Sequence, residues 1–168
     1  MKCKTQLKFI NFIEKQSLIN KKDKLILALS GGPDSVFLLN LLNNIKEKYE
    51  LNLRIAYVNH NLRGEDSLLE EKFIRNLCEI LNLELHVLNG NIKDYSRDNK
   101  VGLEEAGREV RYGFFQKLLN QLSADKIALA HNLDDNVETF LFRLMRGSSI
   151  SGLKSIPLKR DKYIRPIL

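Results

Sequence analysis

A six-residue segment, Ser-Gly-Gly-Pro-Asp-Ser at residues 30–35, has the composition of a phosphate-binding turn. It follows a short apolar run, and its two glycines allow the backbone to turn tightly and to approach a ligand closely. A helix behind this turn would direct free N–H groups and the positive end of its dipole at an anion. The spacing is not that of a Walker A loop, which also needs a lysine. The alternative, an ordinary strand-to-helix turn with proline at the first helical position, fits the whole hexapeptide less well.

A second polar segment, His-Asn-Leu-Asp-Asp-Asn-Val-Glu-Thr at residues 131–139, carries carboxylates at helical spacing. On a helix that begins near Asp134, Asp135 and Glu138 share a face, and paired carboxylates can hold an ammonium group or a metal ion. Taken alone, the acidic residues are more simply explained as helix caps, with Asp135 and Glu138 at a capping-box spacing. His131 alone is likewise more simply a hydrogen-bonded histidine at the end of a strand.

A third candidate is a pair of arginines, Arg108 and Arg111, three residues apart and off the apolar stripe of their predicted helix. A planar guanidinium suits a carboxylate or phosphate ligand. The alternative is an exposed helix with Glu–Arg pairs, and it is favoured when the segment is considered alone.

The elements that would position these residues alternate between strand and helix. Apolar runs predict strands at residues 25–29, 53–59, 83–88 and 127–130, and apolar periodicity predicts helices at 6–19, 34–48, 103–122 and 134–146. A further helix is expected behind Ser67 and Glu70, which have a capping-box spacing. Residues 89–102 are expected to form a loop, residues 147–168 to be rich in loops with a short final strand, and residues 6–19 to pack on an edge. This order predicts an α/β fold, a Rossmann-like parallel sheet with helices on both faces.

Three apolar stripes are expected to face the core. Their members are Leu69, Phe73, Leu77 and Leu81; Ala106, Val110, Phe114, Leu118 and Leu122; and Val137, Phe140, Leu141 and Leu144. The three polar clusters at residues 30–35, 60–64 and 131–139 each follow a predicted strand. Because ligands of open α/β sheets bind at the carboxyl ends of the strands, this coincidence favours one shared crevice.

The bulk composition narrows the class of protein. The chain has 168 residues, 43% of them hydrophobic, which fits one globular domain. No apolar run approaches the ~20 residues of a membrane helix, so we expect a cytoplasmic protein without membrane contact. Two cysteines without a CxxC motif give no indication of a zinc or iron–sulfur site. The net charge of +6 is concentrated in residues 1–24 and 143–168, around an acidic middle. This distribution suits a polyanionic partner or, as the simpler alternative, a solvated basic surface.

The hexapeptide resembles the SGGxDS signature of the PP-loop ATP pyrophosphatases. That resemblance implies an adenine-nucleotide α-hydrolase-like fold that cleaves ATP between its α- and β-phosphates, with Mg²⁺ bound through the phosphates. It implies that Asp34 also lies near the reacting centre. The ATP-binding set that it implies is Ser30, Gly31, Gly32, Pro33, Asp34, Ser35 and His60.

Five motifs in order resemble, more narrowly, the tRNA(Ile)-lysidine synthetase family. They are the hexapeptide, His-Asn-Leu-Arg at 60–63, the Glu104–Tyr112 segment, residues 131–139, and Arg-Gly-x₄-Gly-Leu at 146–153; the Ile-Arg-Pro-Ile-Leu at 164–168 also matches. The resemblance implies that L-lysine is joined to the wobble cytidine of tRNA(Ile) with a CAU anticodon. It assigns catalysis to Asp34, His131, Asp135 and Glu138, lysine binding to Arg111, Asp135 and Glu138, and contacts with tRNA to Arg143 and Arg146.

The family usually continues into C-terminal tRNA-binding domains. We therefore expect residues 1–168 to be a single PP-loop catalytic domain without them. Two alternatives stay open: another PP-loop ligase or thiolase, and a non-catalytic nucleotide-binding module of the same fold. A thiolase would usually carry catalytic cysteines, and neither Cys3 nor Cys78 lies at the end of a predicted strand.

Overall fold

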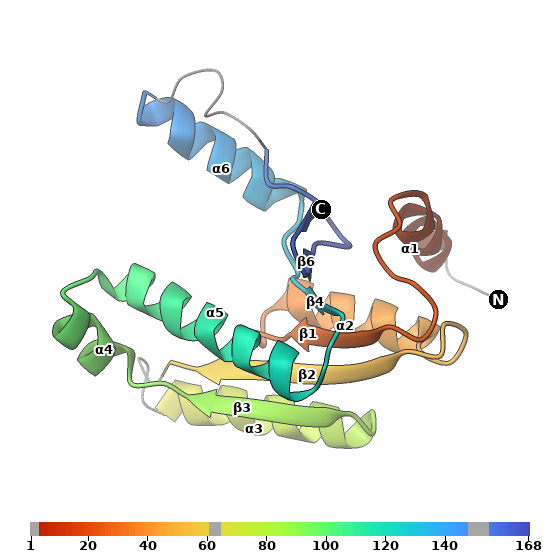
Figure 1. Cartoon of the computed structure of the whole chain (residues 1–168), viewed down its shortest axis with the longest axis horizontal. Coiled ribbons are helices and arrows are strands. Elements are labelled where there is room, and N and C mark those ends of the chain that lie inside the picture. The colour runs from red at the N-terminus through yellow and green to blue at the C-terminus, as the bar shows by residue number, and fades with distance from the viewer. Residues whose placement is uncertain (1–3, 61–64, 148–154) are drawn as a thin grey trace.

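The computed structural model describes residues 4–60, 65–147 and 155–168. Its centre is a sheet of six strands in the order β3-β2-β1-β4-β6-β5 (Figure 1). The strands are β1 (Lys24–Ala28), β2 (Asn52–Asn59), β3 (Glu84–Asn89), β4 (Lys126–Ala128), β5 (Lys159–Arg160) and β6 (Tyr163–Ile164). All neighbours are parallel except β5, which pairs with β6 in the antiparallel sense.

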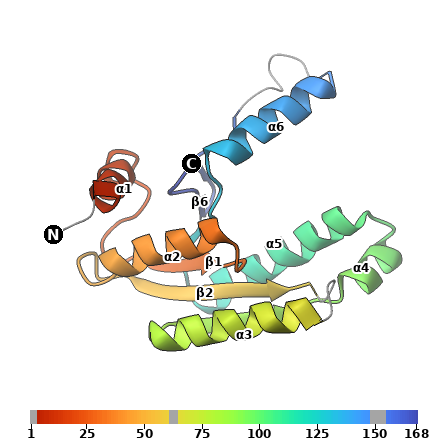
Figure 2. The same cartoon turned by 180° about the vertical axis from the view of Figure 1, so that it is seen from behind.

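Helices cover both faces of this sheet. They are α1 (Lys4–Lys15), α2 (Pro33–Ile45), α3 (Glu65–Ile80), α4 (Ile92–Asn99), α5 (Leu103–Gln121) and α6 (Leu133–Met145). α2 and α3 lie on one face and α5 lies on the other, as Figures 1 and 2 show from opposite sides. One buried apolar cluster lies under α2 and α3 and a second lies under α5. The predicted α/β fold is therefore confirmed.

The order in which the strands are added to the sheet reverses beside β1. β2 and β3 extend the sheet on one side of β1, and β4 and β6 extend it on the other. At such a switch point the loops that follow the two central strands lead away from each other and leave a crevice at the carboxyl edge. The segments after β1, β2 and β4 all reach this edge, as the sequence predicted. No helix within the described residues has the length and apolarity needed to cross a membrane.

Residues 89–102, expected to form a loop, contain the helix α4. Asn91 begins it, since its side chain accepts a hydrogen bond from the backbone N–H of Asp94 at 3.2 Å. Lys100 ends it in the left-handed conformation with φ +56°. Ile92 is its only buried residue, so the segment has no apolar periodicity from which a helix could be predicted.

The start and the buried face of α3 also differ from the prediction. Ser67 lies inside the helix, which already includes Glu65, so Ser67 and Glu70 do not form its cap. Ile74 and Cys78 are the buried positions, whereas Leu69 and Phe73 are 67% and 48% exposed. On α5, Phe115 and Leu119 are buried beside the predicted Ala106 and Leu118.

The helix α6 projects from the body of the molecule, and none of its residues is buried (Figure 1). The predicted core stripe is therefore wrong: its four members, Val137, Phe140, Leu141 and Leu144, are 42–52% exposed. Amphipathic spacing shows which face of a helix is apolar, but it does not show that the same chain covers that face. α6 is attached to the following segment by a hydrogen bond from Ile156 N to Asn136 Oδ1 at 2.7 Å.

Two smaller differences concern the ends of the described chain. α1 packs on α2, where Gln6 Nε2 donates to Leu41 O at 3.2 Å, and not on the edge strands β3 or β5. The final strand ends at Ile164, and the short antiparallel β5 was not expected.

A buried ion pair joins the residue before β1 to β4, at the end of the sheet opposite the crevice. Lys126 Nζ lies 2.7 Å from Asp23 Oδ2, and the two side chains are 11% and 9% exposed. We predict that Lys126→Met lowers the free energy of unfolding by about 3–5 kcal/mol, because it leaves an uncompensated buried carboxylate. Urea denaturation measures this change.

Lys48→Met is the matched control. Lys48 forms an ion pair with Glu14 at 3.8 Å, but its side chain is 51% exposed, so the loss should be below about 1 kcal/mol. Equal losses in the two variants would contradict the structural role of the Asp23–Lys126 pair.

Candidate functional site

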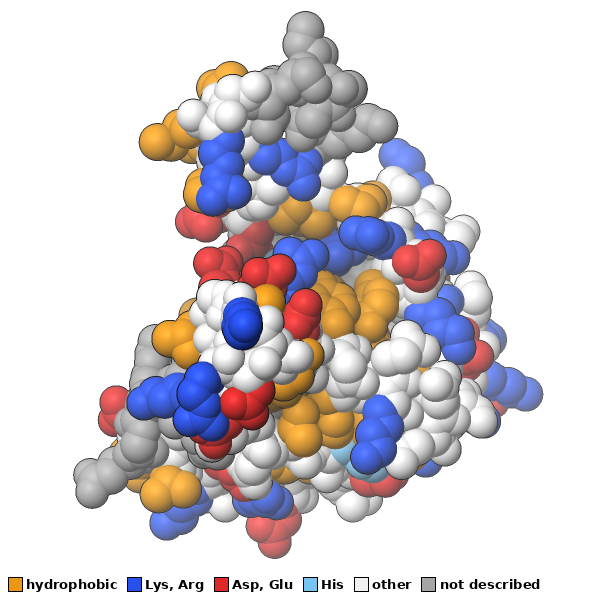
Figure 3. All heavy atoms as spheres, turned by 60° about the vertical axis from the view of Figure 1, so that its left-hand side comes forward, with side chains coloured by type: hydrophobic (Ala, Val, Ile, Leu, Met, Phe, Trp, Pro, Cys, Tyr) orange, Lys and Arg blue, Asp and Glu red, His pale blue; other side chains and the backbone are white. Residues whose placement is uncertain are grey.

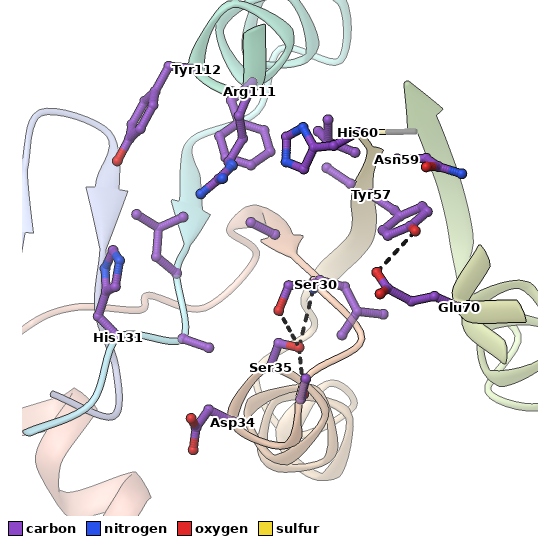
Figure 4. Close-up of a pocket in the computed structure, with 18 of the residues that line it drawn as sticks. Ser30, Asp34, Ser35, Tyr57, Asn59, His60, Glu70, Arg111, Tyr112 and His131 are labelled. Atoms are coloured by element: carbon purple, nitrogen blue, oxygen red, sulfur yellow. Dashed lines mark hydrogen bonds between the residues drawn. The ribbon is translucent and has the colours of Figure 1, made fainter. Parts of the chain in front are cut away.

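The turn after β1 is organised by the hydroxyl group of Ser35. This side chain is 3% exposed; it donates to Gly32 O at 2.8 Å and accepts from Ser30 N and Ser30 Oγ, both at 3.2 Å (Figure 4). The turn then enters α2 with Gly32 as the N-cap and Pro33 in the first turn. No side chain caps this helix, so its first N–H groups are open to an anionic ligand.

The two glycines of the turn differ in whether the structure leaves room for a side chain at their positions. Gly31 has φ +76°, and a Cβ atom added there would lie 2.9 Å from Glu70 Cγ. Gly32 has φ −72°, and an added Cβ would meet only Ser30 Oγ at 3.6 Å. Glycine at position 31 is therefore needed both for the backbone conformation and for the close approach of α3.

The β2 wall of the crevice is anchored to α3. Tyr57 Oη donates to Glu70 Oε1 at 3.0 Å, and burial followed by this hydrogen bond raises the pKa of Tyr57. Asn59, which is 2% exposed, donates to Glu71 Oε2 at 3.0 Å. The hydrogen bond from Asn59 leads the causes that lower the pKa of Glu71. These bonds hold Glu70 over the phosphate turn.

His60 follows β2, and its ring lies beside Arg111 of α5 (Figure 4). Its Nδ1 atom is buried and has no hydrogen-bond partner among the described residues. Burial and then the positive charge of Arg111 lower the pKa of His60, while Glu70 opposes them. A neutral imidazole with an unused buried nitrogen is suited to a hydrogen bond with a ligand.

The opposite wall consists of the residues after β4. Asn132 caps α6 by accepting from Asp134 N at 2.8 Å and Asp135 N at 3.1 Å, and Asp135 Oδ2 accepts from Asn132 N at 2.7 Å. The capping box therefore joins Asn132 to Asp135, not Asp135 to Glu138. Because one carboxylate oxygen is sufficient for the cap, Asp135 can cap the helix and contact a ligand at once.

One pocket of about 510 Å³ connects these walls at the carboxyl edge of the sheet. Figure 3 shows a hollow beside the projecting α6, with acidic and basic side chains on its walls. The volume falls in the range of small-molecule sites. The predicted site residues that line the pocket are Ser30, Gly32, Asp34, Ser35, His60, Arg111, His131 and Asp135.

Three predicted site residues on α6 or directly after it do not line this pocket: Glu138, Arg143 and Arg146. Glu138 is exposed, and the Arg146 guanidinium lies 4.2 Å from the centre of the Phe142 ring. Their assigned roles stay predictions. Residues 61–64 and 148–153 of the recognised motifs lie outside the described residues.

The pocket also contains residues to which sequence reasoning gave no role. Tyr57, Asn59 and Glu70 line it, and so does Tyr112. Tyr57 and Asn59 lie two residues apart on β2 and therefore share a face. The polar side chain of Asn59 at the end of a buried strand was the signal from which its place in the pocket could have been predicted. Nothing in the sequence indicated that Glu70 lines the pocket, because its spacing from Ser67 suggested a helix cap.

No group of three or more metal-ligating side chains is present among the described residues. Asp34 is an exposed carboxylate at the rim of the pocket, next to the phosphate turn. One carboxylate together with substrate phosphates is a usual environment for Mg²⁺. The residues therefore fit an ion that enters with a nucleotide.

A parallel sheet with an anion-binding turn and a polar pocket at its switch point defines a nucleotide-binding α/β domain. Residues 1–168 match a family model described as a PP-loop domain. The chain belongs to this family.

Curated relatives include a tRNA(Ile)-lysidine synthase from Clostridium perfringens. It is 45% identical over 162 residues, which are 96% of this chain and 34% of that protein. A tRNA(Ile)-lysidine synthase from Bacteroides thetaiotaomicron is 41% identical over 97% of this chain and 37% of its own length. The chain thus spans about a third of the length of these curated relatives.

Solved structures share the fold at lower identity. The U34-tRNA thiolase NcsA from Methanococcus maripaludis matches with a TM-score of 0.76 and 22% identity, over 97% of this chain and 58% of that chain. The NH3-dependent NAD synthetase from Campylobacter jejuni matches with a TM-score of 0.58 and 18% identity, over 96% and 65%. At these identities the likeness concerns the fold alone.

Proposed function

We propose that the chain is the ATP-using catalytic region of a tRNA-modifying ligase that joins L-lysine to the wobble cytidine of tRNA(Ile) with a CAU anticodon. One observation carries the proposal: an anion-binding turn, a guanidinium at Arg111 and a carboxylate at Asp135 all line one pocket. The turn suits ATP, while the guanidinium and the carboxylate suit the carboxylate and the amine of an amino acid. The similarity to tRNA(Ile)-lysidine synthases supports this choice of substrates.

The reaction has two steps. The O2 atom of cytidine attacks the α-phosphorus of ATP, and the bond to pyrophosphate breaks. The ε-amine of lysine then forms a bond to C2, and AMP leaves with the former O2. The amine gives up protons in this step, so a base is required. The chain contributes mainly by holding the reactants in place and by stabilising charge.

Each wall of the pocket has its own part in this proposal. Ser30, Ser35 and the first N–H groups of α2 bind the pyrophosphate end of ATP, and His60 lines the nucleotide pocket. Asp34 lies next to the reacting phosphates, where Mg²⁺ would neutralise negative charge. Asp135 and His131 face the amine and C2.

The state of the cysteine favours this proposal over a cysteine-dependent thiolase. Cys78 lies on the buried face of α3 and is 2% exposed, and burial raises its pKa to about 11. A buried thiol with a raised pKa is a poor nucleophile. Cys78 does not line the pocket, and Cys3 lies outside the described residues.

Arg111→Ala should raise the Michaelis constant for lysine by about 10- to 100-fold, the effect of losing a hydrogen-bonded charge. ATP affinity should change less, because the phosphate turn is a separate wall. Both constants are measured on a protein that contains this chain, with ATP–pyrophosphate exchange as the assay of the first step.

Arg108→Ala is the matched control, since Arg108 is one turn away and does not line the pocket. Loss of ATP binding with unchanged lysine use in Arg111→Ala would show that the roles are wrong. A wild-type protein that binds ATP but catalyses no exchange with tRNA would instead be a non-catalytic module.

A further inference from the structure

Arg165 is a buried cation directly behind the pocket. It follows β6 and is 7% exposed. Its guanidinium donates twice: Nη1 to Pro157 O at 2.9 Å, and Nε to His131 Nδ1 at 3.1 Å. Its backbone N–H donates to Leu158 O at 2.9 Å. These bonds hold the side chain in a single orientation toward His131.

The hydrogen bond between Arg165 and His131 determines which nitrogen of the imidazole carries a proton. A guanidinium has only donors and does not lose its proton in proteins. His131 Nδ1 must therefore be the acceptor, and the proton of the neutral ring is on Nε2. A proton on Nδ1 would break this bond and place two cations in contact.

Most of the other charged groups near His131 also lower its pKa. Arg111 and Arg108 on α5 also disfavour the imidazolium, and Asp135 on α6 is the one carboxylate that opposes them. Burial comes first and Arg165 second among the causes that lower the pKa of His131. Burial lowers the pKa of Arg165, and Tyr112, which lines the same pocket, opposes this effect.

We propose that Arg165 is a positioning residue that holds His131 as the neutral Nε2–H tautomer, so that His131 donates a hydrogen bond to a substrate oxygen and does not accept the proton of the attacking amine. A base at Nε2 would need the proton on Nδ1, where Arg165 already donates. Within the described pocket, Asp135 is then the carboxylate on this wall that can accept the amine proton. This inference rests on the proposed function for the identity of the amine, but the tautomer does not depend on it.

Long-range proton–nitrogen NMR on protein labelled with ¹⁵N-histidine measures the tautomer without any substrate. The chain has three histidines, and His131→Gln identifies the signals of His131. We expect one protonated Nε2 and one unprotonated Nδ1, with no change between about pH 8 and about pH 5.5, where an ordinary histidine becomes charged. A proton on Nδ1, or titration at the ordinary pKa, would overturn the proposal.

Two variants distinguish the direct contact of Arg165 with His131 Nδ1 from the general effect of a nearby positive charge. Arg165→Met should raise the pKa of His131 toward its ordinary value and produce a mixture of tautomers. Arg108→Met, which removes a cation that does not contact Nδ1, should change the tautomer little. If Arg165→Met does not fold, the wild-type spectrum alone still decides the tautomer.

The role of His131 in the reaction is tested separately, by the pH dependence of lysine transfer. In Arg165→Met, lysine transfer should be slower than in the wild type at about pH 8, where part of His131 is the Nδ1–H tautomer, and the difference should shrink as the pH falls below about 6.5, because the imidazolium also donates at Nε2. A new loss of rate at low pH that follows the titration of His131 in a folded variant would identify His131 as a base and reject the donor role. If the protein transfers no lysine at all, the proposed function fails while the NMR result stands.

Discussion

Valine in place of Gly31 should lower the affinity for ATP by about 100-fold or more. A β-branched residue is strongly disfavoured at φ +76°, and its Cβ would lie 2.9 Å from Glu70 Cγ. The turn must therefore change its backbone conformation, which moves the N–H groups away from the phosphates. Two charge-assisted hydrogen bonds of about 1.5 kcal/mol each correspond to roughly this factor. Titration calorimetry with ATP and Mg²⁺ measures it.

Gly32→Ala is the control for this experiment. Its φ of −72° suits any residue, and an added Cβ has Ser30 Oγ at 3.6 Å as its nearest neighbour. We expect a loss of affinity of less than about threefold, which is under 1 kcal/mol. Wild-type ATP affinity in a folded Gly31→Val protein would show that the turn does not bind the phosphates.

Asp135→Asn should slow lysine transfer by about 100-fold or more, the usual contribution of a positioned general base. The asparagine oxygen can still accept from Asn132 N, so the cap of α6 is kept and stability should fall by no more than about 1 kcal/mol. ATP–pyrophosphate exchange should be affected less than transfer. Single-turnover measurements of the two steps separate these effects.

Asp134→Asn tests whether the effect comes only from charge at the start of α6. Asp134 is exposed on the same helical turn and does not line the pocket. Its replacement should leave lysine transfer within about threefold of the wild type, since a single exposed charge has a small effect. Equal losses in the two variants would assign the effect to the helix and not to Asp135.

The sequence predicted the central elements because their signals are strong. Buried parallel strands are continuous apolar runs, and β1, β2 and β4 follow such runs. β3 is a partly buried edge strand in which Leu85 and Val87 alternate with Glu84 and His86. The long helices α2 and α5 have regular periodicity. α4 has one buried residue, Ile92, and β5 has two exposed ones, so neither has a pattern to detect.

The pocket could be predicted only in part, for a related reason. Clusters such as residues 30–35 are continuous in sequence and follow strands, so the topology alone brings them to one edge. Glu70 and Arg165 reach the pocket from behind, through contacts with Tyr57 and His131 that depend on three-dimensional packing. Their local spacing suggested a cap for Glu70 and no role for Arg165. The exposure of α6 is likewise a property of the tertiary arrangement.

The position of β1 between β2 and β4 has a consequence for how the domain folds. β2 follows β1 closely in the chain and pairs with it. The pairing of β1 with β4, in which Leu25 and Ile26 lie opposite Lys126 and Ile127, instead joins segments that are far apart in the sequence. Contacts at such separation form slowly, because loop closure must precede them. A chain that has left the ribosome only as far as α4 has the phosphate turn but lacks Arg111, His131 and Arg165. Tight nucleotide binding should therefore begin only when β4 and β6 have joined the sheet, and ATP would stabilise the completed domain without helping its earlier intermediates.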